Sequence, residues 1–148
     1  MANQKELDGV YMQTALAHAS LSKAVRAQVG AVLVTSHGVT LTGYNGTPRG
    51  LNNCCEVFQT WYDGPVYVTK PEVIHAELNC IMKAAREGVS CVDSTVYVTL
   101  SPCVQCSAMM IQAGVKRLVY KTPYRDMAGL ILLKEAGVLT QSFHEAMQ

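Results

Sequence analysis

The chain has 148 residues, of which 49% are hydrophobic and 16% are charged, and its formal net charge is +1 at pH 7. This length suits one hydrophobic core and predicts a single domain over residues 1–148. The near-neutral charge argues against long nucleic acid as a ligand, because such ligands favour a basic surface. The apolar runs are too short to span a membrane and the N-terminal residues lack a secretory pattern, so we expect a cytoplasmic protein.

The first half of the chain predicts a helix, a hairpin and a long loop. Apolar residues recur at helical spacing over 7–21, and apolar stretches at 28–35 and 39–43 flank a Ser-His-Gly turn. Glycine, proline and asparagine then dominate 44–53, and loop chemistry continues toward Asp63-Gly64-Pro65. Loops of this kind often carry function.

The second half alternates helical and strand patterns. In chain order it predicts a helix at 73–87, a strand at 94–100, a helix from Pro102 to Gly114, a strand at 115–120, a helix at 128–136 and a short edge strand at 138–143. Such alternation predicts an α/β fold, with a central mixed, partly parallel β-sheet and helices on both faces.

Four residues at two predicted helix starts suggest zinc chemistry. Cys103 and Cys106 form a Cys-x-x-Cys pair behind Pro102, where helix N–H groups favour thiolates. His75 can add an imidazole, which leaves one position of a tetrahedral zinc open to water. Glu77 stands two residues after His75, and a carboxylate beside that water can move its proton to a leaving amine. The set predicts a hydrolytic deaminase.

Each half of this pattern has a plainer explanation. Cys-x-x-Cys also occurs as half of a structural zinc site or as two core cysteines, and His-x-Glu alone is a weaker signal. Their order favours catalysis, since each half opens a predicted helix and a strand lies between them. His-x-Glu followed by Pro-Cys-x-x-Cys is also a known signature of zinc deaminases.

Through these residues the chain resembles the cytidine and deoxycytidylate deaminase superfamily, and in particular its dCMP deaminase branch. The resemblance also includes Gln28-Val29-Gly30-Ala31-Val32, the loop Gly43-Tyr44-Asn45-Gly46-Thr47-Pro48-Arg49-Gly50, and Tyr97-Val98-Thr99-Leu100-Ser101 before Pro102. It implies a three-layer α/β/α fold and one zinc per chain, bound by His75, Cys103 and Cys106. It further implies that Glu77 shuttles a proton while hydroxide attacks C4 of cytosine, so that dCMP becomes dUMP, a precursor for thymidylate synthesis.

The resemblance also implies substrate contacts. Asn45 would hydrogen-bond the sugar or the base, Tyr124 would lie near the nucleotide, and Ala76 would line the site between the metal ligand and the catalytic acid. Lys23 and Arg26 are our candidates for the phosphate. Plainer explanations stay open: a turn asparagine, a packed tyrosine and solvated surface charge.

Relatives of this kind are commonly homohexamers, activated by dCTP with magnesium and inhibited by dTTP. The candidates for effector binding or subunit contact are Tyr44, Gly46, Arg49 and Arg86. Arg86 would also suit a helix C-terminus through the dipole alone.

One departure concerns a second, structural zinc that some phage relatives hold. Cys54 and Cys55 are present, but no histidine lies between His37 and His75, so we predict that this second site has lost its ligands. The competing functions are deamination of a 5-substituted dCMP or of another cytosine nucleoside or nucleotide, and a non-catalytic zinc module that would give Glu77 no role.

Overall fold

A five-stranded mixed sheet forms the centre of the computed structural model, which describes residues 1–148 apart from the side chain of Trp61. Its strand order is β2-β1-β5-β6-β7, with bounds β1 (Gly30–Val34), β2 (Thr40–Tyr44), β5 (Thr95–Leu100), β6 (Arg117–Thr122) and β7 (Leu139–Ser142). Strand β1 runs antiparallel to β2 and β5, whereas β6 runs parallel to β5 and β7. The mixed, partly parallel sheet predicted from the sequence is confirmed.

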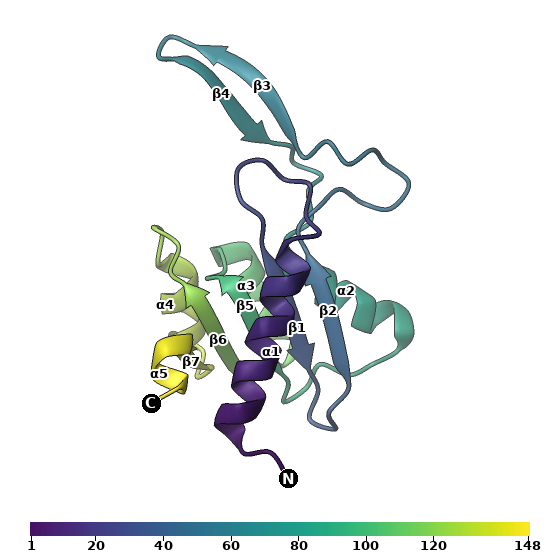
Figure 1. Ribbon diagram of the computed structural model, residues 1–148, viewed down its shortest axis with the longest axis vertical. Coiled ribbons are helices and arrows are strands. Elements are labelled where there is room, and N and C mark those ends of the chain that lie inside the picture. Colours follow the sequence, from purple (N-terminus) through teal and green to yellow (C-terminus); the bar gives the residue numbers. More distant parts are fainter.

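Helices cover both faces of this sheet (Figure 1). One face carries α1 (Gln4–Ala19) and α5 (Phe143–Ala146), and the other carries α2 (Ala76–Glu87), α3 (Val104–Ala113) and α4 (Ala128–Glu135). Within the described part of the chain, no helix combines the length and the apolar character needed to cross a bilayer.

The strands support two cores because successive side chains point to opposite faces. On β1, Leu33 packs into the cluster under α2, α3 and α4, while Val32 packs into the cluster under α1. On β5, Val96 and Tyr97 divide in the same way. This alternation produces the three-layer α/β/α arrangement.

Two glycines allow close backbone contacts that fix helix positions. A methyl group at Gly30 would lie 1.9 Å from the carbonyl oxygen of Ala15, so α1 can rest directly on β1 only because this residue is glycine. A methyl group at Gly129 would lie 2.1 Å from the carbonyl oxygen of Pro102. Helix α4 therefore packs against the residue that precedes Cys103.

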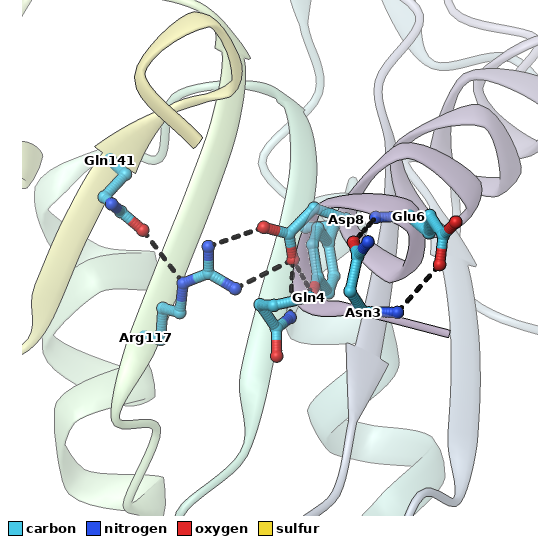
Figure 2. Close-up of polar contacts among 7 residues, drawn as sticks. Asn3, Gln4, Glu6, Asp8, Arg117 and Gln141 are labelled. Atoms are coloured by element: carbon cyan, nitrogen blue, oxygen red, sulfur yellow. Dashed lines mark hydrogen bonds and ion pairs between the residues drawn. The ribbon is translucent and has the colours of Figure 1, made fainter. Parts of the chain in front are cut away.

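A buried ion pair connects α1 to the sheet (Figure 2). Asp8 is 1% exposed and accepts two hydrogen bonds from the Arg117 guanidinium, at 2.8 and 2.7 Å. Its Oδ1 also accepts from the Tyr97 hydroxyl at 2.6 Å and from the Gln4 amide at 2.8 Å, while Arg117 donates to Gln141 on β7. Burial alone would raise the pKa of Asp8, but the hydrogen bonds from Arg117, Tyr97 and Gln4 outweigh it and lower the pKa below 3.8.

The largest departure from the sequence prediction is a second hairpin, β3 (Glu56–Trp61) and β4 (Gly64–Thr69), which extends away from the central sheet (Figure 1). The Asp63-Gly64-Pro65 segment was predicted as loop, but β-branched and aromatic residues flank it on both sides, a pattern typical of a hairpin. The rings of Phe58 and Tyr67 meet edge to face across the strands, 5.4 Å apart. The sequence also did not predict the short helix α5, which follows β7. Other differences are at element ends; for example, α1 begins at Gln4, where Asn3 and Glu6 form a capping box.

Candidate metal centre and active site

Two helix starts bring the predicted metal ligands together. His75 is the residue before α2 and Cys103 is the residue before α3, each with extended backbone. The Cys103 sulfur accepts a hydrogen bond from the backbone N–H of Cys106 at 3.5 Å, so the Cys-x-x-Cys pair turns both sulfurs toward one point. The exposed N–H groups of α3 favour negative charge on these sulfurs.

The distances within this group fit zinc. Nδ1 of His75 lies 3.6 Å from Sγ of Cys103 and 3.3 Å from Sγ of Cys106, and all three ligand atoms lie within 4.8 Å of one another. An ion with tetrahedral bonds of about 2.0–2.3 Å separates its ligand atoms by about 3.5 Å. One imidazole and two thiolates also match a catalytic zinc site, in which the fourth position is open.

The two thiols differ strongly in acidity. Hydrogen bonds from Cys106 and His75 lower the pKa of Cys103 to about 3. Conversely, the hydrogen bond to Cys103 and burial raise the pKa of Cys106, and the hydrogen bond with Cys103 raises the pKa of His75. The pair therefore carries one negative charge readily and needs a cation to carry two, which is the electrostatic demand that zinc meets.

Glu77 lies in the first turn of α2 and is 3% exposed. Burial raises its pKa to about 7, although its own backbone N–H and His75 act in the opposite direction. A carboxyl group with this pKa both accepts and releases a proton near neutral pH, as a general acid–base requires.

A cavity of about 370 Å³ opens over these residues. His75, Ala76, Glu77 and Cys103 line it, and its volume lies in the range of about 300–1,000 Å³ typical of small-molecule sites. Glu77 and two of the three metal-ligand candidates, His75 and Cys103, therefore face one shared space.

Three further predicted residues line this cavity: Arg26, Asn45 and Tyr124. Asn45 accepts the Val29 N–H at 2.8 Å and donates to the Ala27 carbonyl at 2.8 Å, so its amide already holds the loop before β1. Tyr124 is partly buried, and its backbone N–H donates to Ser101 at 2.7 Å. Lys23 is exposed and does not line the cavity, which leaves Arg26 as the better of the two phosphate candidates.

Sequence reasoning did not name four polar residues of the cavity wall as site candidates: Glu56, Thr69, Ser101 and Arg125. Arg125 directly follows Tyr124, so its place beside the nucleotide candidate was a usable signal. Glu56 and Thr69 lie at the base of the β3–β4 hairpin, and nothing in the sequence placed that hairpin over the site.

The regulatory candidates lie outside the cavity lining, but two of them contact the start of α2. Gly46 and Ile74 exchange backbone hydrogen bonds at 3.1 and 2.8 Å, and Asn79 donates to the Tyr44 carbonyl at 2.7 Å. Arg49 is exposed, and Arg86 is an exposed residue paired with Glu87.

The other cysteines show no second ligand group within the described side chains. Cys54 is exposed and Cys55 is buried next to it, and burial raises the pKa of the Cys55 thiol. Cys80 and Cys91 are buried in the core.

Comparison with known proteins agrees with this geometry. Residues 5–122 match the family described as the cytidine and deoxycytidylate deaminase zinc-binding region. Deoxycytidylate deaminase of phage T4 is 35% identical over 79% of this chain and 79% of its own length. Deoxycytidylate deaminase of Saccharomyces cerevisiae is 34% identical over 92% of this chain, which spans only 44% of that yeast relative.

A solved structure shows the same fold over nearly the whole chain. The dCMP deaminase of cyanophage S-TIM5, determined in complex with dCMP and dUMP, superposes with a TM-score of 0.84 at 38% identity. The match covers 95% of this chain and 99% of the phage chain.

Proposed function

Because the chain belongs to the family of cytidine and deoxycytidylate deaminases, we propose that it hydrolyses dCMP to dUMP and ammonia. The observation that carries this proposal is the His75, Cys103 and Cys106 group beside a buried Glu77, at one cavity. When bound by this group, zinc would act as a Lewis acid and would make water a better nucleophile near neutral pH.

The chain's own residues then account for the proton transfers. The oxygen of water bonds to C4 of cytosine, and the bond between C4 and the exocyclic nitrogen breaks. Glu77 accepts the first proton that water loses and delivers it to N3 of the ring. It then moves the remaining hydroxyl proton to the exocyclic nitrogen, so that C4 keeps a carbonyl oxygen and ammonia leaves without a negative charge. Burial of Glu77 limits the contact of this carboxyl group with bulk water.

The rim of the cavity supports a nucleotide rather than a free base. Arg26 and Arg125 both line it, and a guanidinium group is well suited to a phosphate. Tyr124 offers an aromatic ring on the same wall. Asn45 fixes the loop before β1 through its two backbone hydrogen bonds, and the second N–H of its amide group can still donate to a ligand.

We also propose that a nucleotide effector, dCTP with magnesium or dTTP, acts through the loop that contains Tyr44, Gly46 and Arg49. Its support is the Gly46–Ile74 hydrogen-bond pair, which connects this loop to the residue before His75. An effector that moves the loop would thus move a metal ligand. The homohexamer, the contact role of Arg86, the single zinc and the cytoplasmic location stay predictions.

A substrate panel tests the assignment. Absorbance should show rapid turnover of dCMP and much slower turnover of deoxycytidine, because the two arginines gain charge-assisted contacts only from the phosphate. Turnover of CMP shows whether the enzyme requires a deoxyribose, and turnover of 5-methyl-dCMP shows whether it accepts a substituent at C5. Each substrate is measured with and without dCTP plus magnesium. Equal turnover of dCMP and deoxycytidine would contradict a monophosphate substrate.

A further inference from the structure

Arg26 lies on the irregular segment between α1 and β1, and the base of the β3–β4 hairpin holds it there. Glu56 opens β3 and pairs directly with Thr69, the last residue of β4. Both residues line the cavity together with Arg26. Among the described side chains of the hairpin, which otherwise extends away from the sheet, Glu56 and Thr69 are the two that line the cavity.

Glu56 holds the backbone of this segment. Its Oε1 accepts the Val25 N–H at 2.9 Å and the Arg26 N–H at 3.2 Å, and the residue is only 7% exposed. A buried carboxylate that accepts two backbone N–H groups fixes the local chain strongly, because charge-assisted hydrogen bonds are among the stronger kinds.

Thr69 holds the side chain. Its Oγ1 accepts a hydrogen bond from a terminal guanidinium nitrogen of Arg26 at 3.2 Å. Among the described side chains the ion pairs are Arg86–Glu87 and Arg117–Asp8, so no carboxylate forms an ion pair with the Arg26 guanidinium. Its positive charge stays available to an anion in the cavity.

From this arrangement we propose that Glu56 and Thr69 are positioning residues, which orient Arg26 toward the substrate phosphate. This inference rests on the proposed function. A free arginine side chain samples many rotamers, and binding must otherwise remove this entropy. The hairpin base removes part of this freedom in advance and therefore raises affinity for the nucleotide without touching the reacting atoms.

A double-mutant cycle tests the coupling, with dUMP affinity measured by calorimetry beside KM and kcat for dCMP. Arg26→Ala should weaken dUMP binding by about tenfold or more, the scale of a lost charge-assisted hydrogen bond. Glu56→Ala should weaken it several-fold with kcat unchanged. If Glu56 acts through Arg26, adding Glu56→Ala to Arg26→Ala should cause little further loss.

Conservative variants separate positioning from simple structural damage. Glu56→Gln keeps an oxygen that can accept both N–H groups and should restore affinity to within about threefold of the wild type. Thr69→Val should weaken dUMP binding without changing the unfolding temperature, and Glu72→Ala, which removes an exposed carboxylate, should have no effect. Zinc content and thermal unfolding are recorded for every variant.

The outcomes are distinct. Full additivity in the double mutant, or a Glu56→Gln variant as weak as Glu56→Ala, would overturn the positioning role. A wild type that binds dUMP but does not deaminate dCMP would overturn the proposed function, while the binding cycle would still decide the role of Glu56. A wild type that does not bind dUMP would overturn both.

Discussion

Replacement of Glu77 with Gln is expected to lower kcat for dCMP by about 10²–10⁴-fold, the usual contribution of a general acid–base. The amide has nearly the same shape as the carboxyl group but cannot accept and return a proton. Since Glu77 is not one of the three ligand candidates, the variant should still bind zinc. Initial rates and zinc content measured on the same preparation check both statements.

Glu87→Gln is the matched control, because Glu87 lies on the same helix but is exposed. It should leave kcat and zinc content unchanged. A zinc-loaded Glu77→Gln protein with near-normal kcat would exclude Glu77 as the proton shuttle and would revive the non-catalytic zinc module.

Replacement of Asp8 with Asn is expected to lower the free energy of unfolding by about 3–5 kcal/mol at pH 7, as is typical when one partner of a buried ion pair is removed. The Arg117 guanidinium, whose side chain is 12% exposed, would stay in the core without its charge partner. Urea unfolding measures the change. The surface pair Arg86–Glu87 gives the contrast, since Glu87→Gln should cost about 1 kcal/mol or less.

The effect of Asp8→Asn should also depend on pH. The folded state lowers the pKa of Asp8 below 3.8, so the stability that its charge contributes is fully present well above that value. It is lost as pH falls through the lower folded pKa, where Asp8 becomes protonated. The difference between wild type and variant should thus be constant from neutral to mildly acidic pH and shrink in strong acid. A difference that grows in acid would contradict the assignment.

The metal centre could be predicted because its signal is local. Pro102, Cys103 and Cys106 share one helix start, and His75 and Glu77 share another, so each half is readable within a few residues. The fold is needed only to bring the two halves of the site together, and the resemblance to known deaminases implied that fold.

The other polar features could not be predicted, because they depend on contacts between distant residues. Asp8 and Arg117 are 109 residues apart, and a single aspartate on an amphipathic helix is normally solvent-facing. Glu56 and Arg26 are 30 residues apart, and their contact depends on where the β3–β4 hairpin lies. Local propensity carries no information on either pairing.

The most direct test of the central claim is to measure dUMP and ammonia production from dCMP by the wild-type chain, before zinc removal, after chelation and after zinc is restored. We expect equal amounts of the two products, loss of turnover on chelation, and recovery when about one zinc per chain is bound again. Turnover that survives complete zinc removal, or no turnover by the zinc-loaded chain, would contradict a zinc-dependent dCMP deaminase.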